Sequence, residues 1–213
     1  MKNISLVYAC FIALMLGTAA CSNNAPEKKT AEIVKPDSVV IRATKEPEAE
    51  TKRGPVINIG DTLSLKRMVL TIKDSAATQQ RVSMKLADIY GTKLGAFIKK
   101  NNLKISGAAM AWYKGTTAPY FFEAGLPIDK KPAKLAAGMY LKQIGIDSIV
   151  VAHFYGPYDL LPQAYDALKD WLKDHKKTIK GAPYEIYVDD PRDATGKLKD
   201  PYKVQTDVVF AWK

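Results

Sequence analysis

The stretch FIKKNNLKISGAAMAWY, residues 97–113, aligns without gaps with WLKDHKKTIKGAPYEIY, residues 171–187. Each stretch begins in an apolar, lysine-ended segment, passes a glycine and ends in a short run rich in apolar and aromatic residues. Lysines followed by glycine are typical of a helix C-terminus, and the run that follows is typical of a strand. A repeated pattern of this length indicates that one structural unit occurs twice.

Both copies are preceded by a helical pattern and, before it, by a strand-like pattern at residues 64–73 and 148–155. The first helix would bury Val82, Leu86, Ile89, Tyr90, Leu94, Phe97 and Ile98, and the second Leu161, Ala164, Tyr165, Leu168, Trp171, Leu172 and His175. We therefore predict an α+β domain of duplicated strand-helix-strand-strand units. It would form an antiparallel sheet with two helices on one face and a ligand cleft on the other.

The repeat is asymmetric at one position that matters chemically. Tyr113 aligns with Tyr187, but Ala111 aligns with Glu185, so only the second copy carries a carboxylate there. Strand alternation places Glu185 and Tyr187 on one face of the sheet. We expect the apolar set on the other face, Tyr184, Ile186 and Val188, to pack on the helices and leave Glu185 on the open face. A carboxylate there is either an ordinary solvated side chain or a group that binds a cation.

A second candidate is Tyr158, in the segment HFYGPYDLLPQAY at residues 153–165. Gly156 and Pro157 make a turn before the second helix and fix this tyrosine close to the strand end, where either packing or binding would explain it. His153 and His175 have no neighbouring ligand at metal-site spacing, so no metal is expected. No phosphate-binding loop or nucleophile motif occurs, so no cofactor is expected either.

Composition narrows the class of partner. The chain has 32 Lys and Arg against 22 Asp and Glu, a net charge of +10, but only five of the basic residues are arginines. A lysine-dominated surface favours solubility over base recognition, so nucleic acid is not an expected partner.

The N-terminus has the features of a secretory signal. Lys2 precedes an apolar run, and small residues lead directly to Cys21. We predict a lipoprotein signal peptide at residues 1–20, acylation of Cys21 as a membrane anchor, a flexible tether at residues 21–60 and a domain at residues 61–213. The protein would face the periplasm from the cell envelope. Ser22 after the cysteine resembles the sorting signal of outer-membrane lipoproteins.

From residue 64 onward the sequence resembles the GyrI-like effector-binding domain, which also occurs in AraC-type and MerR-type regulators. The resemblance is strongest in HFYGPYDLLPQAYDALKDWL and APYEIYVDDP, between residues 153 and 191. It implies two SH2-like units and a cleft that binds hydrophobic, often cationic small molecules. By position, it implies a buried glutamate at Glu185 and wall residues at Tyr187, Tyr158, Tyr113, Trp112 and Phe122.

Three functions remain open at this point. The first is an envelope-anchored protein that captures a hydrophobic or cationic ligand through Glu185. The second, also implied by the resemblance, is a hydrolase of electrophilic small molecules that uses Glu185 as general acid or base. The third is a non-catalytic interaction protein whose partner docks on the exposed sheet.

Overall fold

The computed structural model describes residues 53–213. The predicted signal peptide, the acylation site Cys21 and most of the predicted tether lie outside this range. Within it, no helix is both long enough and apolar enough to cross a membrane.

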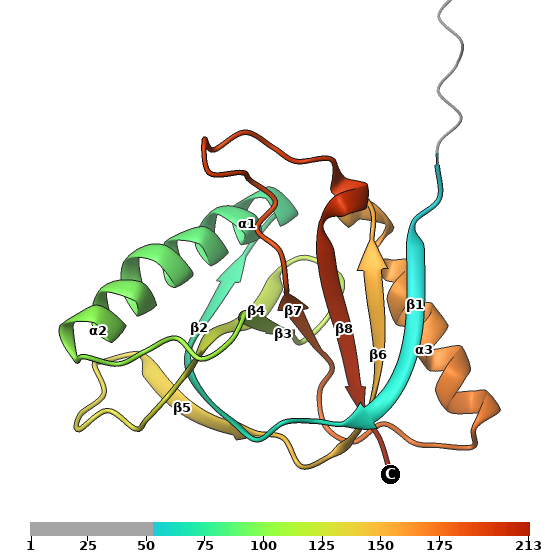
Figure 1. Cartoon of the computed structure of the whole chain (residues 1–213), viewed down its shortest axis with the longest axis horizontal. Coiled ribbons are helices and arrows are strands. Elements are labelled where there is room, and N and C mark those ends of the chain that lie inside the picture. The colour runs from blue at the N-terminus through green and yellow to red at the C-terminus, as the bar shows by residue number, and fades with distance from the viewer. Residues whose placement is uncertain (1–52) are drawn as a thin grey trace, which may run out of the picture. The chain divides into compact units, whose positions relative to one another are not determined.

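The domain is built on an antiparallel sheet of eight strands in the order β1-β6-β8-β7-β3-β4-β2-β5 (Figure 1). The strands are β1 (Val56–Leu63), β2 (Arg67–Ala76), β3 (Ala109–Tyr113), β4 (Tyr120–Ile128), β5 (Met139–Ile144), β6 (Ser148–Tyr155), β7 (Tyr184–Tyr187) and β8 (Gln205–Ala211). The helices are α1 (Gln79–Asp88), which continues through a π-helical segment (Ile89–Leu94) into α2 (Gly95–Lys100), and α3 (Pro162–Asp174). Short 3₁₀ turns occupy Tyr158–Leu160 and Pro201–Lys203.

The strand order confirms the predicted duplication. β2, the first helical segment, β3 and β4 form one unit, and β6, α3, β7 and β8 form the other. The units join where β3 pairs with β7, and Ala111 lies directly opposite Glu185 in that pairing. The two residues that align in the repeat are therefore neighbours at the centre of the sheet.

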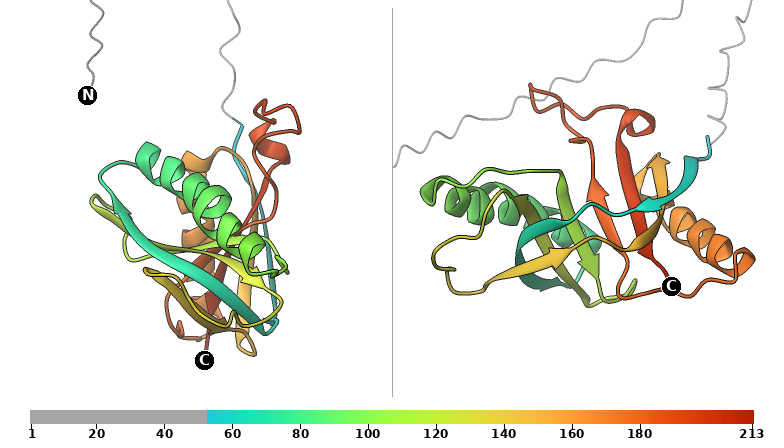
Figure 2. Two further views of the ribbon diagram at one scale, coloured as in Figure 1. Left: turned by 90° about the vertical axis from the view of Figure 1, so that its left-hand side faces the viewer. Right: turned by 60° about the horizontal axis from the view of Figure 1, so that its bottom comes forward.

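Each helical segment covers its own half of the sheet, as Figure 2 shows. α1 and α2 bury Leu94 and Ile98 against β2 and β4, whereas α3 buries Leu168 and Leu172 against β6 and β8. The first helix begins at Thr78, whose hydroxyl accepts a hydrogen bond from the backbone N–H of Arg81. Burial of these two apolar stripes follows the predicted helical periodicity.

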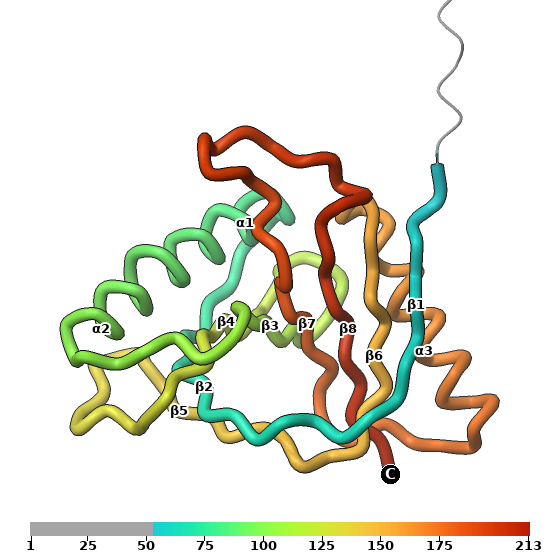
Figure 3. Tube along the Cα trace, in the orientation of Figure 1, coloured from blue at the N-terminus to red at the C-terminus, as the bar shows by residue number. Residues whose placement is uncertain are grey.

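The edge strands β1 and β5 are exchanged between the units. β1 precedes the first unit but pairs with β6, and β5 precedes the second unit but pairs with β2 (Figure 3). The β1–β2 and β5–β6 connections consequently meet, where the N–H of Ser64 donates to Asp147 O at 2.9 Å and the N–H of Ile146 to Ser64 O at 3.0 Å. Gly145, at φ +106°, allows this close approach, because a Cβ there would collide with the carbonyl oxygen of Leu65.

Two boundaries differ from the sequence expectation. β1 begins at Val56 and pairs along its full length with β6, so residues 56–60, predicted as tether, belong to the sheet. Seven of its eight residues are exposed, which explains why the strand has no clear hydrophobic alternation. The strand predicted at residues 64–73 lies instead at Arg67–Ala76, because the preceding residues form the crossing connection.

Candidate functional site

Glu185 is a buried carboxylate at the centre of the sheet, with only 3% of its surface exposed. Alternation along β7 sets Glu185 and Tyr187 on one face and Tyr184 and Ile186 on the other, as predicted. The expectation that Tyr184 and Ile186 pack on the helices is wrong. They lie on the helix-free face in a separate apolar cluster with Met110 and Val209, while Glu185 faces the helices and accepts a hydrogen bond from Tyr165 on α3.

Three tyrosine hydroxyls donate to the carboxylate of Glu185. Tyr165 donates to Oε1 at 2.8 Å, Tyr187 donates to Oε2 at 2.9 Å, and Tyr158 makes a short bond to Oε2. The donors come from α3, from β7 and from the turn that precedes α3. The second repeat therefore supplies both the carboxylate and all of its donors.

The first repeat contributes two further tyrosines. The hydroxyl of Tyr113 lies 2.9 Å from that of Tyr187. Tyr90, in the π-helical segment, has its ring 6.2 Å from that of Tyr187 and donates its hydroxyl to Met110 O at 2.9 Å. We call these five residues the tyrosine cluster: Tyr90, Tyr113, Tyr158, Tyr165 and Tyr187.

The environment makes ionisation of Glu185 harder than that of a solvated carboxyl. Burial raises the pKa of its carboxyl above the usual value, and the hydrogen bonds from Tyr158, Tyr165 and Tyr187 lower it again only in part. Burial and the charge of Glu185 also raise the pKa of each of these tyrosines, so they remain protonated donors. No lysine or arginine among residues 53–213 forms an ion pair with Glu185.

Tyr158 forms the outer side of the site. This residue is 47% exposed, yet its hydroxyl reaches the buried carboxylate of Glu185. It starts the 3₁₀ turn that follows Gly156 and Pro157. The Tyr158 side chain therefore extends from the surface of a connecting turn to the carboxylate.

Four of the predicted site residues share the tyrosine cluster, a fifth borders it, and the sixth lies on the opposite face of the sheet. Glu185, Tyr187, Tyr158 and Tyr113 share the cluster, as described above. Phe122 is buried among the apolar residues beneath α1, 6.2 Å from the ring of Tyr113. Trp112 points to the opposite face, where its ring lies 5.6 Å from that of Tyr184 and 4.1 Å from the ammonium group of Lys142.

Sequence reasoning missed Tyr165 and Tyr90 as members of the site. Both were assigned to the apolar faces of their helices, which is where they lie. The available signal was the phenolic hydroxyl itself, since a tyrosine on a buried helix face needs a hydrogen-bond partner.

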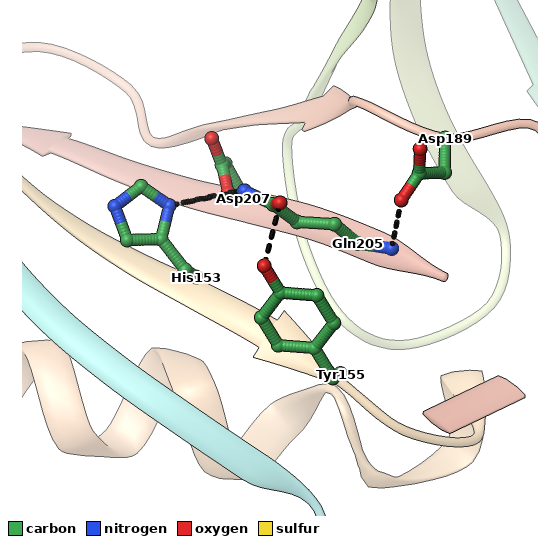
Figure 4. A network of polar contacts seen from close by, with 5 residues as sticks. All are labelled: His153, Tyr155, Asp189, Gln205 and Asp207. Atoms are coloured by element: carbon green, nitrogen blue, oxygen red, sulfur yellow. Dashed lines mark hydrogen bonds and ion pairs between the residues drawn. The ribbon is translucent and has the colours of Figure 1, made fainter. Parts of the chain in front are cut away.

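A separate polar network lies on the helix-free face of β6 and β8 (Figure 4). His153 Nδ1 lies 2.7 Å from Asp207 Oδ1, and Gln205 Nε2 donates to the same oxygen at 2.8 Å. Tyr155 donates to Gln205 Oε1 at 2.7 Å, and the carboxylate of Asp189 accepts from the backbone N–H of Gln205. Within residues 53–213, no group of three or more His, Cys, Asp or Glu side chains has the arrangement of a metal site.

Comparison with known proteins places this geometry in a family. The C-terminal domain of EcmrR has 18% sequence identity and a TM-score of 0.62, over 74% of this chain and 98% of that one. SAV2435 bound to tetraphenylphosphonium has 12% identity and a TM-score of 0.51, over 73% and 94% respectively. A search of curated protein sequences found no match. Residues 76–209 match the model of the GyrI-like small molecule binding domain, and the chain therefore belongs to that family.

Proposed function

We propose that the protein binds hydrophobic organic cations at Glu185. The observation that carries this proposal is a carboxylate that is almost fully buried and bonded by three of the five clustered tyrosines. In the described part of the chain it is paired with no cationic side chain. An ionised carboxylate in such a place costs several kcal/mol unless a positive charge joins it. A bound organic cation would supply that charge.

The tyrosine cluster fits the apolar part of such a ligand. A cation against an aromatic face gains about 0.5 to 2 kcal/mol, and the carboxylate adds direct charge recognition. The structural neighbour bound to tetraphenylphosphonium supports this ligand class by analogy. Because Tyr158 is partly exposed and bonds Oε2, we expect a ligand to reach Glu185 by displacing that ring and its hydrogen bond.

Titration calorimetry with tetraphenylphosphonium tests the proposal. We expect Glu185→Gln to weaken binding at least about tenfold, because the substitution removes the charge and keeps the shape. Glu123→Gln is the matched control, since Glu123 is a strand glutamate that bonds Lys142 and Thr71 away from the tyrosine cluster. Equal affinity of the wild type and Glu185→Gln would refute the proposal, as would an equal loss in both variants.

We further propose that the domain works in the cell envelope, facing the periplasm, and is anchored by acyl chains on Cys21. The support is the order of Lys2, an apolar run and small residues before Cys21, followed by Ser22. Metabolic labelling with a fatty-acid analogue should modify the wild-type chain and not Cys21→Ser. Labelling of both, or a chain that keeps residues 1–20, would contradict this anchoring.

Hydrolysis is a second candidate at the same site. The raised pKa of Glu185 and its bond to the Tyr158 hydroxyl suit a general acid or base. Mass spectrometry of epoxide probes incubated with the protein separates the two functions. Turnover by the wild type and none by Glu185→Gln supports hydrolysis, whereas saturable binding without product supports capture alone.

A further inference from the structure

The helix-free face of the sheet, opposite Glu185, holds a pocket of about 170 Å³. Its wall is mostly apolar and includes Met110, Ile149, Val151, Tyr184, Ile186 and Val209, with the polar side chains of His153 and Asp207 at one side. Residues 62–65, at the end of β1 and the start of the crossing connection, line it as well. A cavity of roughly 150 Å³ with similar lining accommodates benzene, so this pocket has room for about one ring or a short alkyl chain.

Arg67 brings a positive charge to this pocket. No carboxylate in the described part of the chain forms an ion pair with it. Its guanidinium lies beside Gly107, where even a Cβ would come within 3.1 Å of Nη1. The absence of a side chain at Gly107 thus leaves space for the Arg67 guanidinium. The N–H groups of this guanidinium have no carboxylate partner within residues 53–213.

Tyr184 adds a second donor. Its ring is 9% exposed and lines the pocket, and its hydroxyl makes no hydrogen bond with another residue of the described range. Burial raises the pKa of this hydroxyl and the positive charge of Arg67 lowers it, so the guanidinium acts on the hydroxyl electrostatically. Arg67 and Tyr184 thus place two donors, with no protein acceptor in the described range, beside an apolar wall. This arrangement fits a ligand that has both an acceptor group and an apolar body.

We infer that this pocket binds a small organic carboxylate whose body is one ring or a short alkyl chain. The carboxylate of the ligand would accept a bidentate pair of hydrogen bonds from the Arg67 guanidinium and a further hydrogen bond from the Tyr184 hydroxyl. The body would lie on Val151, Ile186 and Val209. This site differs from the proposed cation site in sheet face and in the charge that it selects.

Asp207 sets the orientation of the ligand. It also lines the pocket, and its Oδ1 is already held by His153 and Gln205 (Figure 4). Its negative charge would repel a carboxylate, so the head group lies towards Arg67 and the apolar body towards Asp207.

Benzoate and hexanoate are suitable probes, with benzyl alcohol as the uncharged analogue. We expect saturable binding of both acids by calorimetry, weakened at least about tenfold in Arg67→Gln and less in Tyr184→Phe. Arg81→Gln, on the exposed surface of α1, is the control for lost positive charge and should bind normally. Glu185→Gln should also bind normally, which separates this site from the proposed cation site.

A measurement on the wild type guards against a variant that fails to fold. Methyl NMR during benzoate titration should shift the signals of Ile149, Val151 and Val209 and leave those of Leu168 and Leu172, beneath α3, in place. No saturable shift at millimolar benzoate would overturn the inference. Shifts confined to residues outside the pocket, or undiminished affinity in Arg67→Gln, would also overturn it.

Discussion

The hydroxyl of Tyr165 offers a direct measure of what holds the carboxylate of Glu185. It is the one tyrosine donor to Oε1 in the described part of the chain, at 2.8 Å, while Oε2 has two. Tyr165→Phe removes this donor and keeps the ring, which packs 5.8 Å from that of Phe210. A hydrogen bond to a charged group contributes about 1.5 to 3 kcal/mol, so the free energy of unfolding should fall by that amount while Glu185 is ionised.

For a domain of this size, each kcal/mol shifts the melting temperature by roughly 2 to 4 °C, so a drop of about 3 to 12 °C is expected. Urea denaturation at a series of pH values gives the free energy itself, and the full loss is expected where Glu185 is ionised. Tyr155→Phe is the matched control, because it removes a hydroxyl bonded to the neutral side chain of Gln205 at 2.7 Å. That loss should be smaller, about 0.5 to 1.5 kcal/mol.

A double-mutant cycle isolates the charge. In a Glu185→Gln background the hydroxyl of Tyr165 faces a neutral amide, so Tyr165→Phe should cost only about 0.5 to 1.5 kcal/mol. An equal cost in both backgrounds would show that the hydroxyl stabilises the fold for some reason other than the carboxylate. It would contradict the expectation that Tyr165 preferentially stabilises the ionised carboxylate of Glu185.

Three further outcomes follow from particular contacts. Because burial raises the pKa of Glu185, its contribution to stability is present below the unfolded-state pKa and is lost as pH rises through the folded-state pKa. Glu185→Gln should therefore gain stability over wild type between pH 4 and pH 8 in denaturation curves, and a constant difference would contradict this. Leu168→Ala, at a fully buried position on α3, should lower the free energy of unfolding by about 2 to 5 kcal/mol in urea denaturation. A loss under about 1 kcal/mol would contradict this. Gly145→Ala combines strain at positive φ with a collision at Leu65, so thermal melting should show a much larger loss than for the exposed control Gly91→Ala.

The duplication could be predicted because both repeats preserve the same order of helix end, glycine and strand. The gapless alignment that paired Ala111 with Glu185 also identified two residues that lie opposite each other in the sheet. Alternation along β7 separated Glu185 and Tyr187 from Tyr184 and Ile186 correctly. These features depend on local periodicity, which a sequence displays directly.

The face to which Glu185 points could not be derived in this way. The prediction assumed that apolar residues on β7 must meet the helices, but the helix-free face has an apolar cluster of its own around Met110 and Val209. Alternation gives relative and not absolute orientation. Trp112 was placed with the wall residues by the family resemblance, although it lies across the sheet from Glu185.

The membership of Tyr165 and Tyr90 depends on packing between distant segments. In the sequence, each of these tyrosines occupies a position on the apolar face of its helix. Only the folded structure brings both side chains close to β7. The strand β1 was not predicted, for a different reason. It is an exposed edge strand, held by its pairing with β6 more than by burial of its own side chains.

Under the proposed function, Glu185 supplies the charge that binds an organic cation. The affinity for tetraphenylphosphonium, measured from pH 4 to pH 8 in wild type and Glu185→Gln, tests this role. A carboxyl whose pKa is raised by burial must ionise to pair with the ligand, so wild-type affinity should strengthen with pH, while Glu185→Gln should bind weakly at every pH. Affinities that follow the same pH course in both proteins would contradict the claim.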